Sequence, residues 1–252
     1  MTEENTCLFR RLTLACGNFF FRFRNGLFPL TFVVLFFLTR PALFLGNESL
    51  DLLAVAAGIA IAVAGQIFRL LVIGFAYIKR GGKEGRVWAE DLVVKGFYAH
   101  SRNPMYVGNF LITVGVGIIY GSPWIYFLVI PFFSFVYGSI VAVEENYLLG
   151  RFGAPYEDYM RRVNRFIPNF HGIQESLREF HYDWKRALRK DYGTMFGLML
   201  GILFLNAWKA YYIFGFAERK RGILTCAVLL VPATAFYITT RILKLSKRLA
   251  SS

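Results

Sequence analysis

Two segments of the chain, residues 96–108 and residues 144–168, hold the side chains whose types and spacing could do chemistry. The first reads Gly-Phe-Tyr-Ala-His-Ser-Arg-Asn-Pro-Met-Tyr-Val-Gly. The second opens on two adjacent glutamates and continues through Phe-Gly-x-x-Tyr-x-x-Tyr to Phe-Ile-Pro. Each polar stretch adjoins a long apolar run. Ionisable side chains at a membrane boundary are costly and usually functional, so the sequence places the candidate chemistry here.

The first segment predicts the start of a helix with an anion-binding end. Asn103 is a favourable N-cap residue and Pro104 a favourable first helical residue. A helix N-terminus offers unpaired N–H groups and a partial positive charge, so a carboxylate or phosphate could bind there and Arg102 could clamp it. Tyr98 and Tyr106 flank this position and could stack on a flat heterocycle or a cation. The alternative is a capped helix whose arginine contacts lipid phosphates.

The second segment predicts an anionic wall. Glu144 and Glu145 follow an apolar run, where their charges repel each other and the dipole of a helix C-terminus disfavours both. A bound ligand with an amine or a ribose diol would offset this cost, and so would Arg102 or Arg151. Neither glutamate has the histidine or cysteine neighbours of a tight metal site, so no metal is expected. The two segments together predict a pocket for a zwitterionic ligand.

The composition indicates a membrane protein that positions these segments. The chain has 252 residues, of which 56% are hydrophobic and 18% aromatic. Apolar runs of about 18 residues or more are candidates for membrane spans. We therefore predict an all-α polytopic integral membrane protein with about six transmembrane helices and additional cytosolic interfacial helices. The predicted spans cover residues 26–45, 52–78, 105–120, 124–143, 194–216 and 223–243, and a tight turn at 121–123 joins the third to the fourth.

The charge distribution predicts the orientation. The net charge of +13 would suggest a nucleic-acid partner in a soluble protein, but here the positions of the charges argue against one. Lysine and arginine concentrate at 10–24, 79–102, 151–190 and 241–248, all on one side of a six-span arrangement. This positive-inside pattern places both termini and the active site in the cytosol, in contact with membrane lipids. The Arg-Lys-Arg run at 219–221 is an exception on the predicted outer side.

The polar stretch between the fourth and fifth spans predicts two further helices. Pro155 suits the first turn of one helix, and Pro168 is expected to end it. Apolar residues then recur at helical spacing from 173 to 188, which predicts an amphipathic helix along the lipid headgroups. The predicted organisation is an interfacial segment at 1–25, a membrane core at 26–168, an amphipathic interfacial helix at 169–192 and a C-terminal transmembrane hairpin at 193–252.

Other features inside the spans point to packing and to buried charge. Small residues such as Gly58 and Gly65 allow close helix packing in lipid. Arg69 could extend its side chain to the cytosolic headgroups or face a polar cavity within the bundle. Lys209 has the same two alternatives, of which the sequence favours the headgroups, or else a shorter helix.

The two motifs resemble those of the isoprenylcysteine carboxyl methyltransferase superfamily, which includes the phospholipid N-methyltransferases. The resemblance covers about residues 85–168. It implies an all-helical membrane enzyme that uses S-adenosylmethionine at the cytosolic edge and takes a lipophilic substrate, a lipid or another small molecule, sideways from the bilayer. Arg102 and Glu145 are then the catalytic candidates. The resemblance implies cofactor contacts from Tyr98, Asn103, Pro104, Met105, Tyr106 and Glu144, with backbone around 90–93. The residues that carry it are Gly96, Tyr98, Arg102, Pro104, Tyr106, Gly108, Glu144, Glu145, Phe152, Gly153, Tyr156 and Tyr159.

Two departures from the family pattern bear on the substrate. Asn103 stands where the family usually has histidine. Prenylcysteine enzymes carry an arginine one turn before the paired glutamates, whereas residues 139–141 read Ser-Ile-Val, which argues against prenylcysteine. A carboxylate acceptor needs no base, but an amine acceptor does, and Glu145 or His100 is then the candidate. The sequence decides neither the acceptor nor the oligomeric state.

Two other functions remain open on the sequence. Membrane sterol-type reductases, which use NADPH, share a Ser-Arg-His-Pro-Asn-Tyr stretch that Ser101 and Arg102 fit. Their later motif has tryptophan where this chain has Tyr156, so the paired glutamates and Tyr156 favour a methyltransferase. A non-enzymatic membrane scaffold or transporter would instead place polar residues near the midplane of several spans.

Overall fold

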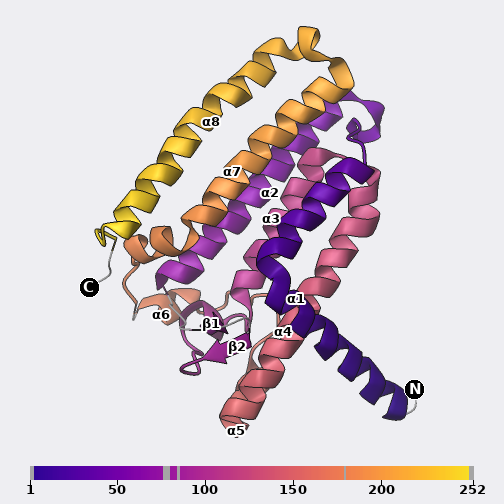
Figure 1. Ribbon diagram of the computed structural model, residues 1–252. Helices are drawn as coiled ribbons and strands as arrows, with labels where there is room; N and C mark the ends of the chain where they lie inside the picture. Colours follow the sequence, from indigo (N-terminus) through magenta and orange to yellow (C-terminus); the bar gives the residue numbers. More distant parts are fainter. Residues whose placement is uncertain (1–2, 76–79, 84–85, 179, 250–252) are drawn as a thin grey trace.

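The computed structural model describes residues 3–75, 80–83, 86–178 and 180–249. Long helices run side by side in a bundle, and α5, α6, β1 and β2 lie at the end drawn lowest in Figure 1. We call the end where α2 finishes and α3 begins the lower end, and the end where α7 turns into α8 the upper end. The long helices are α1 (Glu3–Leu38), α2 (Glu48–Phe75), α3 (Pro104–Tyr120), α4 (Ile130–Phe152), α7 (Trp184–Phe214) and α8 (Phe216–Leu245).

The short elements connect the long helices. The 3₁₀ turn η1 (Phe44–Gly46) precedes α2, and a second 3₁₀ turn, η2 (Gly96–Ala99), precedes α3. The π-helical turn η3 (Ile125–Val129) leads into α4. At the lower end lie α5 (Ala154–Arg162), α6 (Ile173–Arg178) and the antiparallel pair β1 (Arg80–Lys83) and β2 (Arg86–Ala89). The sequence predicted no strands, because this glycine-rich stretch lacks the apolar–polar alternation from which strands are recognised.

The helices support an integral membrane protein but not the predicted count of six spans. Among the described residues, four helical stretches are long and apolar enough to cross a membrane: 48–75, 125–152, 184–214 and 216–245. The 17 residues of α3 fall below that length. At about 1.5 Å per residue they extend roughly 25 Å, short of the roughly 30 Å hydrocarbon core. The predicted first span lies partly within α1, which is one 36-residue helix that passes through the predicted boundary at residue 25 without a break.

The small residues of α2 pack against α3, as predicted. A Cβ added at Gly65 would lie 2.7 Å from the backbone oxygen of Gly108, and one added at Gly58 would lie 2.8 Å from that of Gly115. Only glycine permits this approach of the two backbones. On the other sides, α7 packs on α2, α3 and α8, whereas α1 packs mainly on α4.

Lys209 does not reach the headgroups, which corrects the expectation from sequence. Its Nζ lies 2.6 Å from Asp51 Oδ1 and donates to the backbone oxygen of Ile119 at 3.4 Å. Both charged side chains are almost entirely shielded from solvent. A buried ammonium needs a counter-ion, and the first turn of α2 supplies it. The pair joins α2, α3 and α7 at the upper end, next to the turn at Gly121 (φ 74°).

The lower connections differ partly from the prediction. Pro155 does lie in the first turn of α5, but the helix ends at Arg162, six residues before Pro168. The single amphipathic helix predicted over 173–188 is wrong, because α6 ends at Arg178 and α7 starts at Trp184. The backbone N–H of Asp183 donates to the backbone oxygen of Gly74, which turns the chain upward into α7.

Candidate functional site

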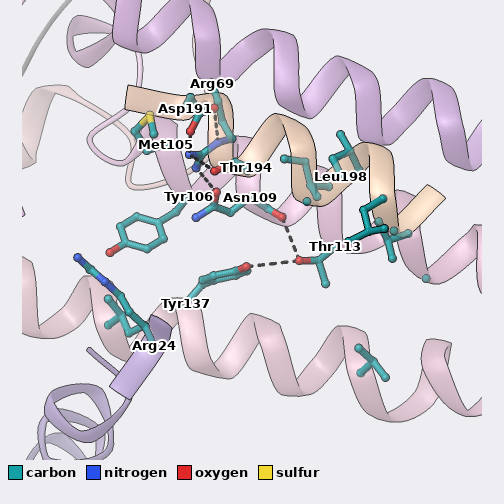
Figure 2. Close-up of a pocket in the computed structure, with 18 of the residues that line it drawn as sticks. Arg24, Arg69, Met105, Tyr106, Asn109, Thr113, Tyr137, Asp191, Thr194 and Leu198 are labelled. Carbon is teal, nitrogen blue, oxygen red and sulfur yellow. Dashed lines mark hydrogen bonds and ion pairs between the residues drawn. The ribbon is translucent and has the colours of Figure 1, made fainter. Parts of the chain in front are cut away.

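The two motifs meet at the lower end, where they line one cavity of about 1250 Å³. The cavity begins near Tyr98 and Asn103 and extends between α1, α2, α3, α4 and α7 toward Tyr120 at the upper end. Figure 2 shows Tyr106, Tyr137 and Arg24 around it, with residues of α7 along the opposite wall. Small-molecule sites usually measure about 300–1,000 Å³, so this cavity has room for more than one small molecule.

A hydrogen bond between Tyr106 and Glu144 joins the two motifs inside this cavity. The Tyr106 hydroxyl donates to Glu144 Oε1 at 2.8 Å, and both residues line the cavity wall. Tyr106 lies in the first turn of α3, and Glu144 lies in the lower part of α4, where it is 4% exposed. A carboxylate so shielded from water needs donors, and the tyrosine provides one.

Glu145 does not line this cavity, and its carboxylate lies between the guanidinium groups of Arg102 and Arg165. Arg165 Nη2 lies 2.6 Å from Glu145 Oε2, and Arg102 Nε lies 3.1 Å from Oε1. The Asn103 amide donates to Oε1 at 3.2 Å. Neutralisation by Arg102 was one of the alternatives drawn from sequence, whereas Arg165 was not foreseen. Arg151 instead donates to the backbone oxygen of Glu90 at 3.4 Å.

Arg102 and Asn103 contact Glu145 and also bind the backbone of the segment 160–165, which follows α4 at the lower end. Arg102 Nη1 donates to the backbone oxygen of Met160 at 2.8 Å, although its Nε–H is not aligned for a hydrogen bond with Glu145. Asn103 occupies the N-cap position of α3, but its side chain makes no capping hydrogen bond. The amide donates instead to Glu145 and, at 3.1 Å, to the backbone oxygen of Arg165. The predicted start of the helix at Asn103 and Pro104 is confirmed, but the Asn103 side chain binds the buried carboxylate of Glu145 and does not cap α3.

The remaining residues predicted for the site divide between the cavity and the scaffold. Tyr98 and Met105 line the cavity, and the Tyr98 backbone oxygen accepts a hydrogen bond from Tyr159 at 2.6 Å. Pro104 is the first residue of α3 and does not itself line the cavity; nor does the segment 90–93. His100, a candidate base, is also outside it: its Nε2 lies 3.0 Å from Ser176 Oγ, and its Nδ1 contacts the backbone oxygen of Asn169.

Ser139, one of the three residues in the turn before the glutamates, has no room for an arginine side chain. A Cβ at Gly17 of α1 would collide with the backbone oxygen of Ser139. Ser139 is 1% exposed and lies under α1. A long charged side chain at this position of α4 would have no space and no water around it. Among the described residues, no group of three histidine, cysteine, aspartate or glutamate side chains is placed to hold a metal ion.

Sequence reasoning missed a polar cluster farther up the cavity wall. Arg69 of α2 forms an ion pair with Asp191 of α7 and donates through Nη1 to Asn109 of α3, as Figure 2 shows. Gln66 Nε2 also donates to Asp191, at 2.6 Å. Arg69 thus faces a polar cavity, the second of the two predicted alternatives. Asp191 escaped notice because it follows other charged residues in a stretch predicted to be interfacial.

Beyond this cluster the cavity becomes apolar. Thr113 Oγ1 donates to the backbone oxygen of Asn109 at 3.0 Å and lies 3.4 Å from the Tyr137 hydroxyl. Thr113 and Tyr137 are thus hydrogen-bonded. Above them, toward the upper end, Tyr120 is the polar side chain that remains on the described part of the cavity wall. The wall then consists mainly of hydrocarbon side chains, among them Ile112, Val116, Ile125, Val129, Leu198 and Leu205.

Comparisons with known proteins match the same helices. A family model described as phospholipid methyltransferase matches residues 53–155. A protein-S-isoprenylcysteine O-methyltransferase from Schizosaccharomyces pombe is 36% identical over 81 residues, which cover 31% of this chain and 33% of that protein. The Saccharomyces cerevisiae protein of the same name is 29% identical over 126 residues, covering 46% of this chain and 49% of that protein.

A third relative carries a different name. The nickel-cobalt-cadmium resistance protein NccN of Alcaligenes xylosoxydans xylosoxydans is 31% identical over 93 residues, covering 33% of this chain and 43% of that protein. The chain thus spans from about a third to about half of the length of these three curated relatives. No solved structure matches.

The matched segment and the site coincide. Residues 53–155 run from α2 to the first turn of α5 and include both Tyr106 and Glu144. The same segment contains the motif residues on which the resemblance was based, except Tyr156 and Tyr159, which follow it. Over this segment, the chain is similar to the superfamily of isoprenylcysteine carboxyl methyltransferases and phospholipid methyltransferases.

Proposed function

We propose that the protein is an S-adenosylmethionine-dependent methyltransferase that acts on a lipophilic acceptor at the cytosolic edge of a membrane. The observation that carries this proposal is the contact between Tyr106 and Glu144 at the polar end of a large cavity whose far end is apolar. The names of the fungal relatives support methyl transfer. The concentration of basic residues in the lower connections supports a cytosolic site.

The residues at the lower end suit the chemistry of this cofactor. S-Adenosylmethionine has a sulfonium and an amine, a carboxylate, a ribose diol and a flat purine, and it supplies an activated methyl group. Glu144 offers a carboxylate to the cationic or diol groups, and Arg102 offers a guanidinium to the carboxylate. The rings of Tyr98 and Tyr106 offer aromatic faces. The proposed cofactor-binding residues are Tyr98, Asn103, Pro104, Met105, Tyr106 and Glu144, of which Pro104 would act by starting α3.

The protein's part in methyl transfer is to align the reactants and exclude water. Transfer from a sulfonium is an in-line displacement in which charge is neutralised, so alignment in a dry cavity lowers the barrier. Tyr106 orients Glu144. The ion pairs of Glu145 with Arg102 and Arg165 hold α4 against the segments that precede α3 and follow α5. We therefore assign Glu145 a positioning role in catalysis, and we assign Arg102 this role in addition to binding the carboxylate of the cofactor. An amine acceptor would transfer its proton to Glu144, because Glu145 does not line the cavity.

A membrane scaffold or transporter would place polar residues inside several spans, and the structure contains such residues. Arg69 with Asp191 and Lys209 with Asp51 are examples. Each is a mutually neutralised pair between helices, which suits a structural role better than an ion path. A scaffold or transporter would bind neither S-adenosylhomocysteine nor NADPH in the experiment that follows.

Equilibrium binding to the purified full-length protein in detergent tests the proposal. We expect S-adenosylhomocysteine to bind saturably and NADPH not to bind. With radiolabelled S-adenosylmethionine and a total lipid extract, we expect label to enter the organic phase. Binding of NADPH alone would replace the proposal with the reductase function, and binding of neither compound would leave the non-enzymatic function.

A further inference from the structure

The cavity is open on one side, and the exposure of its lining shows which side. The lining residues of α2, α3 and α4 are buried or half-buried. Among the lining residues that the structure describes, the exposed ones belong to α1 and α7 alone. The opening therefore lies between these two helices, toward the surrounding membrane. These exposed lining residues are Val33, Phe37, Lys190, Gly197, Leu200 and Phe204.

An aromatic contact closes the opening near its upper end. The ring centroid of Phe36 on α1 lies 5.4 Å from that of Phe204 and 4.9 Å from that of Trp208, both on α7. Below this contact the lining continues along α7 down to Lys190. The helix rises about 21 Å from Lys190 to Phe204, at about 1.5 Å per residue. The opening is therefore a long slot that follows the helix axes.

Glycines on α7 keep the slot wide. Gly197 and Gly201 are one turn apart and both line the cavity. A Cβ added at either would meet no heavy atom of the described chain within 4 Å. Glycines that serve helix packing behave differently, since a Cβ at Gly65 would lie 2.7 Å from the backbone of α3. The two α7 glycines thus border empty space instead of another helix.

The shape and polarity of this space suit a hydrocarbon chain. Above Asn109 the wall is mainly apolar, and the distance from Asn109 to Tyr120 along α3 is about 16 Å. That length is close to half of the roughly 30 Å hydrocarbon core, which is the depth of one leaflet. Charged side chains lie at the lower end of the cavity: Glu144 is bound to Tyr106, and Arg24 lies nearby in Figure 2. A lipid-like molecule with its head at the lower end would therefore match the wall along its length.

We propose that the slot between α1 and α7 binds the hydrocarbon tail of the methyl acceptor, and that Gly197 and Gly201 set the width of tail it admits. The inference rests on the proposed function in one respect, since it places the acceptor's head beside Tyr106 and Glu144. Both helices lie outside the segment 53–155 that matches the family. Selection of the tail is thus a property of the parts of the chain that surround the matched segment.

Photolabelling tests this groove without requiring methyl transfer. The full-length protein in detergent is incubated with palmitic acid that carries a diazirine in its chain, and labelled peptides are mapped by mass spectrometry. We expect saturable label at groove residues such as Val33, Leu200 and Phe204, displaced by excess palmitic acid. Exposed residues of α8, such as Val228, provide the internal control and should take up only label that does not saturate. Equal, non-saturable labelling of both surfaces would overturn the proposal.

Leucine substitutions test the role of the glycines. Gly197→Leu and Gly201→Leu would fill the slot, and we expect each to reduce the saturable labelling about tenfold, as overfilling a packed space does. Gly193→Leu is the matched control, because it lies one turn earlier in similarly open space and does not line the cavity. Unchanged labelling in both groove variants would refute the assignment.

Binding of S-adenosylhomocysteine separates this proposal from the proposed function. All three leucine variants should keep that binding. If the unsubstituted protein shows saturable groove labelling but binds no S-adenosylhomocysteine, the groove stands and the methyltransferase proposal fails. If a leucine variant does not fold, the saturation and competition results of the unsubstituted protein still decide whether the groove exists.

Discussion

At the scale of single residues, Glu144 and Glu145 are neighbours with opposite surroundings. Successive residues of an α-helix point about 100° apart, so two adjacent side chains can face different partners. Glu144 faces the cavity and accepts a hydrogen bond from Tyr106, whereas Glu145 is enclosed by Arg102 and Arg165. The pair that looked like one anionic wall therefore divides into a carboxylate that faces the cavity and a carboxylate that is paired with arginines.

Substitutions of Glu144 and Tyr106 test this division. Glu144→Gln should weaken the affinity for S-adenosylhomocysteine by about tenfold or more, since a charge-assisted hydrogen bond contributes about 1.5–3 kcal/mol. Tyr106→Phe should weaken it about fivefold, because one neutral donor worth roughly 1 kcal/mol is removed. Isothermal titration calorimetry provides the measurement. Glu157→Gln, on the exposed face of α5, is the control, and an unaltered affinity in Glu144→Gln would remove Glu144 from the site.

At the scale of elements, the start of α7 depends on a cap that the sequence pattern did not reveal. Asp183 Oδ1 accepts a hydrogen bond from the backbone N–H of Arg186 at 2.8 Å. Burial by itself raises the pKa of Asp183, but the hydrogen bonds from Arg186 and the charges of Arg186 and Arg189 outweigh burial and hold the pKa below its ordinary value of 3.8. The break between α6 and α7 lies here because this cap begins a new helix.

This cap predicts a pH-dependent contribution to stability. A carboxyl group whose pKa is lowered by folding stabilises the folded state above its unfolded-state pKa, and that contribution is lost as the pH falls through the folded-state value. Asp183→Ala should therefore lower stability by about 1 kcal/mol at pH 7. The difference from the unsubstituted protein should shrink below a pH of about 4. Thermal unfolding in detergent at several pH values measures both effects, and a difference that persists undiminished in acid would contradict the assignment.

At the scale of the whole molecule, two buried ion pairs fix α7 across the cavity. Asp191 pairs with Arg69 of α2 toward the lower end, and Lys209 pairs with Asp51 of α2 near the upper end. Because α7 and α1 flank the slot, these pairs set the position of one of its walls. In Figure 1, α7 lies beside α2, and α8 lies on the outside of the bundle.

Removing one partner of the ion pair between Arg69 and Asp191 should weaken the packing of α7 against α2. Asp191→Asn leaves the charge of Arg69 buried without its counter-ion, and such a loss typically costs about 3–5 kcal/mol. The double substitution Arg69→Met with Asp191→Leu removes both charges and should cost clearly less. Intrinsic tryptophan fluorescence during heating measures the unfolding midpoint. If the single and the double variants lose equal stability, the ion pair is not what holds α7.

The sequence by itself determined the features that depend on neighbouring residues. Hydropathy located four helices long enough to cross a membrane, proline placement marked the starts of α3 and α5, and the turn at 121–123 required a hairpin. The two motifs indicated a resemblance to the superfamily because their residue types recur at fixed spacings, and the comparisons match the same part of the chain. Glu157 with Arg161 and Asp158 with Arg162 paired as the i,i+4 rule predicts.

Only the tertiary structure decided which distant side chains meet. Arg69 and Asp191 are 122 residues apart in the chain. The ion pair of Arg165 with Glu145 and the slot between α1 and α7 likewise have no pattern in the local sequence that would predict them. The physical reason is that a membrane helix is apolar on most of its faces, so hydropathy does not encode how far each helix is rotated about its axis. Backbone contacts at glycines and the pairing of buried charges set those rotations, and they exist only once the helices have assembled.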